Sequence, residues 1–313
     1  MRLKLFPHKG FELEKLDVLL CGKAPPRHLY HYTSINGLEG ILGKRSLWAS
    51  QIHFLNDTQE FKYSFDIFEK VLLELRKELP VGLIPALGPT PPPSNPKELL
   101  ARFYSAMKDM LLEEFVSKTP ICVFSLSEKG DLLSQWRGYC SPGGGYSIGF
   151  RTELLIQFLK TCNLYIEPCI YDEKKQEAIV KQVVSKTGQA FLESSTKDPT
   201  ELQKIGEKYL LQFFVELSRI ASILKHPSFH EECEWRIITT PIQNKNMSFR
   251  VRKSMLIPYF SISLKGIYPF PIDEIIIGPA PEQRLPESSL RQFALQNKLN
   301  ISIKTSKTPY REL

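Results

Sequence analysis

The chain alternates between short runs with an apolar residue at every second position and longer runs with one at every third or fourth position. The first spacing is typical of half-buried strands and the second of amphipathic helices. Strands are expected at residues 29–32, 46–50, 121–125, 146–150, 165–171, 233–240, 255–264, 274–278 and 301–305. We expect the strand at 46–50 to pair beside the strand at 29–32.

Capping signals place the first helices. Thr33 or Ser34 can cap a short helix over 35–42, which Gly43 would end. Asp57 and Glu60 have the spacing of a capping box ahead of a longer helix. The buried stripe of that helix is expected to be Phe61, Phe65, Phe68, Val71 and Leu72. Further helices are expected at 97–117, 131–136, 153–162 and 288–297, and on either side of a breaker region at 186–200.

The order of these elements favours an α+β fold, because strands and helices are mixed without the regular repeat of a doubly wound sheet. Residues 1–27 are expected to form an N-terminal arm and residues 28–313 a single elaborated domain. Seven prolines between residues 80 and 96 predict a surface loop within that domain. A helical insertion is expected at about residues 174–224.

The chain is moderately basic: it has 41 Lys and Arg against 34 Asp and Glu, a formal charge of +7 and a pI near 8.9. This balance favours acidic partners such as nucleic acid, although an evenly solvated surface explains it as well. The six cysteines form no Cys-x-x-Cys pair, as is usual in a reducing compartment. Because the basic N-terminal residues lack the apolar core and cleavage site of a signal peptide, and no apolar run approaches the ~20 residues that span a bilayer, we expect a cytoplasmic protein without a membrane partner.

The segment around His31 carries the first candidate chemistry. Strand alternation points Tyr30 and Tyr32 to one face and His31 and Thr33 to the other. An imidazole beside hydroxyls at a strand-to-helix junction can bind sugar hydroxyls, and the helix N-terminus after Ser34 favours phosphate. His31, Tyr32, Thr33 and Ser34 are therefore cofactor-binding candidates. A structural histidine at a strand end is the alternative.

Glu234 carries the second candidate chemistry, at the head of an otherwise apolar strand. A carboxylate beside a ribose can bind its 2′-hydroxyl and stabilise an oxocarbenium-like transition state as a glycosidic bond breaks. Glu232 would share one strand face with it and could orient or deprotonate a nucleophile. The alternative is an ion pair between Glu234 and Arg236.

Further segments combine aromatic rings, hydroxyls and a cation. Aromatic faces stack on flat heterocycles such as nicotinamide or a base, and an arginine can bind a pyrophosphate. The cofactor-binding candidates in these segments are Phe54, Asn56, Ser125, Trp136, Arg137 and Tyr139. Helix capping also explains Asn56, and core packing also explains Trp136. The glycines at 143–145 lack the lysine and the helix of a phosphate loop and predict a hairpin turn.

His226 and His230, followed by Cys233, have a spacing that can suit zinc. Pro227 interrupts the helical register between them, and no second ligand pair accompanies them. We therefore expect no metal site and keep a metal-dependent nuclease as an alternative function.

Several segments, in this order, resemble a bacterial family known as domain of unknown function 2971. They are residues 29–34, 47–50, 54–60, 124–127, 135–139, 146–150, 234–236 and 274–279. A looser resemblance, carried by the strand histidine, the helix after it and the late strand-borne glutamate, is to the ADP-ribosyltransferase superfamily and its DNA- and RNA-modifying toxin branch. It implies an ADP-ribosyltransferase-like mixed sheet core with helical insertions.

The same resemblance implies roles for single residues. His31 would contact the adenosine-side ribose of NAD, and Glu234 would be the catalytic acid, while Phe54, Trp136 and Tyr139 are each eligible to stack on nicotinamide. His31 stands where the arginine-specific subgroup has an arginine, whereas the two glutamates are similar to that subgroup. The acceptor therefore stays open.

Three hypotheses result. The first is an enzyme that cleaves NAD at the nicotinamide–ribose bond and transfers ADP-ribose to nucleic acid or protein, in phage defence or as a toxin with an antitoxin or regulatory partner. The second is a non-catalytic module that binds a nucleotide or nucleic acid. The third is the nuclease, which would use His226 and His230.

Overall fold

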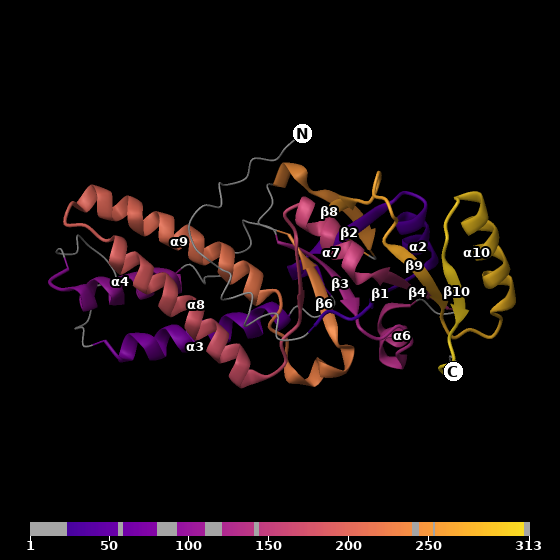
Figure 1. Ribbon diagram of the computed structural model, residues 1–313. Coiled ribbons are helices and arrows are strands. Elements are labelled where there is room, and N and C mark those ends of the chain that lie inside the picture. Colours follow the sequence, from indigo (N-terminus) through magenta and orange to yellow (C-terminus); the bar gives the residue numbers. More distant parts are fainter. Residues whose placement is uncertain are drawn as a thin grey trace.

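The computed structural model describes residues 24–55, 59–79, 93–109, 121–140, 144–239, 244–252 and 254–309, with residues 59–61 and 244 described by their backbone alone. A large mixed β-sheet lies beside a group of long helices (Figure 1). The remaining residues include most of the predicted arm, residues 80–92 of the proline-rich segment, and the candidate Asn56. Predictions on these residues lie outside the described part of the chain.

The described strands form one sheet in the order β10-β9-β4-β1-β3-β2-β8-β7, and β6 pairs with both β3 and β5. They are β1 (His28–Thr33), β2 (Ser46–Gln51), β3 (Cys122–Ser127), β4 (Tyr146–Arg151), β5 (Tyr165–Pro168), β6 (Glu234–Ile238), β7 (Ser248–Arg252), β8 (Met255–Ser263), β9 (Ile272–Ile277) and β10 (Ser302–Thr305). β10 runs parallel to β9, and the other named pairs are antiparallel. The mixed sheet with helices confirms the predicted α+β class.

The predicted pairing of the strand at 46–50 beside the strand at 29–32 is wrong. β1 pairs with β3 and β4, whereas β2 pairs with β3 and β8, so β3 lies between the two. The connection through α2 (Ile35–Leu42) carries the chain across the width of one strand. A segment from nearly a hundred residues later fills the space that this leaves.

The helices follow the predicted periodicity with one correction. The others are α3 (Gln59–Lys77), α4 (Pro96–Asp109), α6 (Leu133–Tyr139), α7 (Thr152–Thr161), α8 (Glu173–Ser194), α9 (Pro199–Ala221) and α10 (Arg284–Gln296), with short 3-10 turns η1 (Ile52–Phe54), η2 (Pro227–Glu232) and η3 (Asn244–Asn246). α8 continues through most of the predicted breaker region at 186–200. Gly188 is a packing position, because a side chain there would come within 2.7 Å of the Tyr104 ring on α4.

Two apolar cores position the functional face of the sheet. One lies among α3, α4, α8 and α9 and reaches the sheet at Val123 and Ile238. These four helices lie side by side at one end of the molecule (Figure 1), so the 174–224 segment packs with earlier helices. The other core joins α2, α7 and α10 to the opposite face, where it takes in Trp235 and Ile237 of β6. Alternation then turns Glu234 and Arg236 away from that second core.

No helix within the described ranges is long and apolar enough to cross a membrane.

Candidate functional site

A local split of the sheet creates the candidate site. β1 pairs with β4 through six residues, but with β3 only at Tyr30 and Ser127. β3 then pairs with β6 from Val123 to Ser127. A cavity of about 830 Å³ lies where the strands diverge, and it is bordered by the end of β1, the start of α2, and parts of β2, β3, α6, β6 and β7. We call this cavity the cleft.

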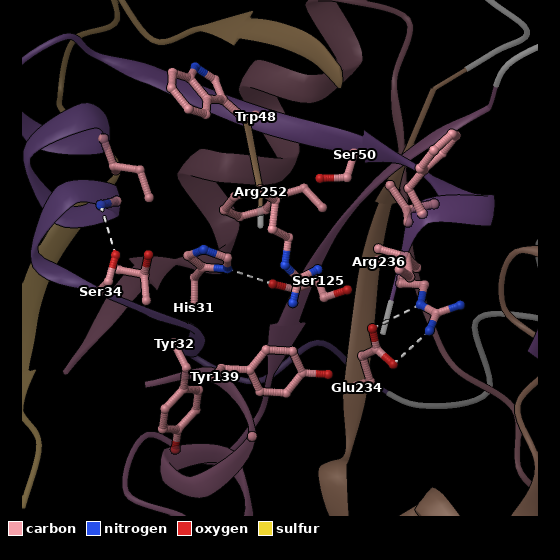
Figure 2. A pocket seen from close by; sticks show the side chains of 18 of the residues that line it. His31, Tyr32, Ser34, Trp48, Ser50, Ser125, Tyr139, Glu234, Arg236 and Arg252 are labelled. Atoms are coloured by element: carbon pink, nitrogen blue, oxygen red, sulfur yellow. Dashed lines mark hydrogen bonds and ion pairs between the residues drawn. The ribbon is translucent and has the colours of Figure 1, made fainter. Parts of the chain in front are cut away.

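His31 of β1 contacts β3 at the point where the two strands diverge. Its ring stacks on Phe124 at 4.2 Å between centroids, and its Nδ1 lies 2.9 Å from the carbonyl oxygen of Ser125 (Figure 2). Burial lowers the pKa of His31 to about 4, against the opposing effect of the Ser125 bond. The ring is therefore neutral near pH 7, and since a carbonyl only accepts, Nδ1 carries the proton. Nε2 remains as a hydrogen-bond acceptor.

Acidification should destabilise the protein through His31. The unfolded chain binds a proton at this residue near pH 6.5 and the folded chain near pH 4. The contribution of His31 to folding stability is therefore complete above pH 6.5, the pKa of this residue in the unfolded chain. About 3 kcal/mol of stability is lost as the pH falls from there to about 4. Urea unfolding of the wild type and of His31→Gln at about pH 7 and about pH 4.5 measures this loss. We expect a smaller loss in the variant, and equal losses would contradict the assignment.

Glu234 forms the centre of a buried ion network. Its Oε1 accepts from Nε of Arg236 at 2.8 Å, and its Oε2 accepts from Nη2 of Arg236 at 3.0 Å and from Nζ of Lys225 at 2.6 Å. Lys225 also donates to Glu232 at 2.7 Å. Burial alone would raise the pKa of Glu234, but the two cations outweigh it and lower the pKa to about 2. The carboxylate is therefore ionised throughout the physiological range.

The predicted arrangement of Glu232 and Glu234 on one strand face is wrong. Glu232 ends the turn η2, and Cys233 adopts a left-handed backbone conformation with φ of 44°, so the strand begins only at Glu234. The two acids still meet, because both bind Lys225. Glu232 is the more accessible, with 19% of its side chain exposed against 6% for Glu234.

Basic residues that sequence reasoning missed give the cleft its charge. Arg250 and Arg252 of β7 line it together with Lys225 and Arg236, so its wall holds four cations and two carboxylates. Arg250 donates to the hydroxyl of Ser50 at 2.9 Å, and its buried Nε has no hydrogen-bond partner among the described residues. A guanidinium in the wall of a basic cleft is suited to bind an anion.

Aromatic residues and a helix N-terminus complete the wall. Trp48 of β2, 36% exposed, stacks on Tyr259 at 4.6 Å between ring centroids. Phe54 and Tyr139 also line the cleft. The ring of Tyr139 lies between His31 and Glu234 in Figure 2. The Ser34 hydroxyl caps α2 by accepting from the backbone of Gly37 at 3.4 Å.

The structure brings most of the predicted site residues together. The predicted residues that line the cleft are His31, Tyr32, Thr33, Ser34, Phe54, Ser125, Tyr139, Glu232 and Glu234. Trp136 and Arg137 do not line it. Trp136 is buried against Tyr32 and Ile276 and donates to Asp131, and Arg137 is exposed on α6. The Tyr32 hydroxyl is also used elsewhere, since it donates to the carbonyl of Lys129.

The histidines of the zinc hypothesis make local contacts. Nδ1 of His226 accepts from the backbone of Ser228, and Nδ1 of His230 lies 3.2 Å from the carbonyl oxygen of Pro227. Within the described part of the chain, no group of three or more His, Cys, Asp or Glu side chains is placed to hold a metal ion.

The fold and the site define a mixed α+β protein with a basic, aromatic-lined cleft at a split in its sheet. Residues 135–237 match the model of a protein family of unknown function, DUF2971. The matched segment begins within α6, which carries Tyr139, and ends in β6, which carries Glu234 and Arg236, so the chain is similar to this family across two walls of the cleft. No curated protein and no solved structure matches the chain.

Proposed function

We propose that this protein is an ADP-ribosyltransferase that cleaves NAD at the nicotinamide–ribose bond. The observation that carries the proposal is that His31 and Glu234, two hundred residues apart in sequence, line one cleft. The cavity of about 830 Å³ is also within the ~300–1,000 Å³ typical of small-molecule sites, and its basic wall suits a dinucleotide with two phosphates. The resemblance to the ADP-ribosyltransferase superfamily rests on these two residues and on the helix that follows His31.

The chemistry of the wall suggests an orientation for NAD. Arg250 and Arg252 would bind the pyrophosphate, and Trp48 offers an exposed aromatic face for a base. Nε2 of His31 would accept a hydrogen bond from a hydroxyl of the adenosine-side ribose. Glu234 would then lie beside the nicotinamide-side ribose.

The reaction needs one carboxylate at the anomeric carbon and one near the nucleophile. The bond from ribose C1′ to the nicotinamide nitrogen breaks, its electron pair neutralises the pyridinium, and Glu234 stabilises the cationic ribose. An acceptor oxygen or nitrogen then bonds to C1′ and loses a proton, which the more exposed Glu232 would take. A macromolecular acceptor, nucleic acid before protein, fits the net charge of +7. Phage defence or a toxin with a neutralising partner is the setting that accords with it.

Replacing Arg250 tests the placement of the phosphates. Arg250→Met should weaken NAD binding about ten- to a hundredfold, because it removes charge-assisted hydrogen bonds. Added salt should weaken binding to the wild type more than to the variant. Titration calorimetry measures both effects, with Arg291→Met as the control, since Arg291 lies on α10 away from the cleft and pairs with Glu287. Equal affinities in wild type and Arg250→Met would contradict the placement.

A second candidate function is a nucleotide- or nucleic-acid-binding module without catalysis. The observation that favours it is that Arg236 and Lys225 already compensate the charge of Glu234. A carboxylate held between two cations has less field to offer a developing positive charge. Calorimetry with intact NAD, followed by chromatography of the same sample, separates the two functions. Released nicotinamide supports the transferase, and binding without release supports the module.

A further inference from the structure

A small recess adjoins the cleft at the two carboxylates. Its volume is about 40 Å³, and it shares His31, Tyr139, Glu232 and Glu234 with the cleft. Tyr30, Ser127 and Gln135 line only the recess among the polar residues. The recess therefore has its own polar wall, formed by residues of β1, β3 and α6.

Two of these three polar groups already have partners. The Tyr30 hydroxyl donates to Glu274, and the Ser127 hydroxyl donates to the carbonyl of Glu232 and accepts from the backbone of Lys129. Gln135 differs from them. Its side chain is 7% exposed, and its amide makes no hydrogen bond with any other residue in the described ranges.

The amide atoms of Gln135 are not fully enclosed by protein, so they are accessible from the recess and available to a ligand there. Gln135 stands on α6, one turn before Tyr139 on the same helix face, so helix geometry directs both toward the recess. A primary amide offers one acceptor and two donors in a plane. Its matching partner is another planar amide edge, with an N–H and a C=O side by side.

The neighbouring charges define the ligand further. Glu232 and Glu234 border the recess, and the pKa of Glu234 is lowered, so this carboxylate stays charged near neutral pH. Lys225 and Arg236 pair with these carboxylates, but neither cation lines the recess, so its wall accepts additional N–H groups and disfavours a negatively charged ligand. A neutral amide therefore fits the recess, whereas the corresponding carboxylate does not.

We propose that Gln135 and the two glutamates form a subsite that binds a neutral planar amide edge. Such an edge can come from the carboxamide of a pyridine ring or from the lactam of a pyrimidine base. This inference depends on the proposed function in one respect: the amide is taken to belong to the substrate or acceptor that binds in the same cleft. Gln135 acts here as a specificity-determining residue.

The test measures binding of three small probes to the full chain by titration calorimetry. Nicotinamide supplies the carboxamide, uracil supplies the lactam, and nicotinate is the charged control. The wild type should bind one of the two amides at least about tenfold more tightly than nicotinate, and Gln135→Leu should reduce that affinity about tenfold. Gln157→Leu, an exposed glutamine on α7, should leave it unchanged.

Each outcome decides the proposal. Binding of nicotinamide that depends on Gln135 identifies a carboxamide as the source, and binding of uracil identifies a lactam. Equal affinity in wild type and Gln135→Leu, or no binding of either amide to the wild type, would overturn the subsite. Gln135→Met, which retains side-chain length, replaces the leucine variant if thermal melting shows that the latter is unfolded. Gln135-dependent binding without NAD cleavage keeps the subsite and removes the proposed function, and NAD cleavage with Gln135-independent binding does the reverse.

Discussion

Glu234→Gln is expected to lower nicotinamide release from NAD about 10²- to 10³-fold. The substitution keeps the shape of the side chain and removes the charge that would stabilise the cationic ribose, and losses of this size follow when one preorganised electrostatic group is deleted. Chromatographic measurement of nicotinamide over time gives the rate for each protein. Release at the wild-type rate in the variant would remove Glu234 from the mechanism.

The same substitution also weakens the structure, so it needs a control that separates the two effects. Removing one partner of a buried ion pair costs about 3–5 kcal/mol in stability. Glu167→Gln removes a comparable charge, because Glu167 is buried and bound to Arg219, and Glu167 does not line the cleft. The two variants should have similar melting temperatures, and only Glu234→Gln should lose activity. A parallel loss in both would show that instability, not chemistry, explains the result.

The predicted fold is most accurate where local sequence determines the structure. The first strand, the helix after it, its cap at Ser34 and its end at Gly43 all form as expected, because alternation and capping act over a few residues. β7 was missed although Phe249 and Val251 alternate with polar residues, because the run is short and both of its faces are mostly exposed. Its arginines were missed with it.

The predicted fold is wrong where packing between segments far apart in the sequence determines the local structure. Gly188 signals a break by composition, yet the close approach of Tyr104 from another helix requires a glycine there. The pairing of β1 was predicted from chain proximity, whereas β3 and β4 come from far along the sequence.

The candidate site was predicted in part for a similar reason. His31 and Glu234 could be found because each is a polar residue in a strand-like run, where burial demands a partner or a use. Lys225 could not be found, because its contact with both glutamates depends on the path of the turn between residues 226 and 233. That turn also explains why Glu232 reaches the site although it does not belong to the strand.

Lys225→Met is expected to destabilise the protein as strongly as Glu234→Gln. Lys225 is 2% exposed, and its ammonium group bridges Glu232 and Glu234. Methionine keeps the length of the side chain but leaves two carboxylates close together without the ammonium group that bridges them. We expect a loss of about 3–5 kcal/mol in the free energy of unfolding near pH 7, measured by urea denaturation.

The pH dependence of that loss tests its electrostatic origin. In the wild type the lowered pKa keeps Glu234 ionised down to about pH 2, against an ordinary value of 4.5. Without Lys225 the pKa of this carboxyl rises, so the variant is protonated there at a higher pH. The difference in unfolding free energy between wild type and Lys225→Met should therefore be largest above pH 4.5 and should narrow as the pH falls.

The control is Lys70→Met, which breaks an exposed ion pair with Glu177 and should have little effect on stability at any pH. A difference between wild type and Lys225→Met that stays constant down to about pH 3 would instead indicate loss of the cation–π contact with Phe229, whose ring centroid lies 5.0 Å from the ammonium nitrogen.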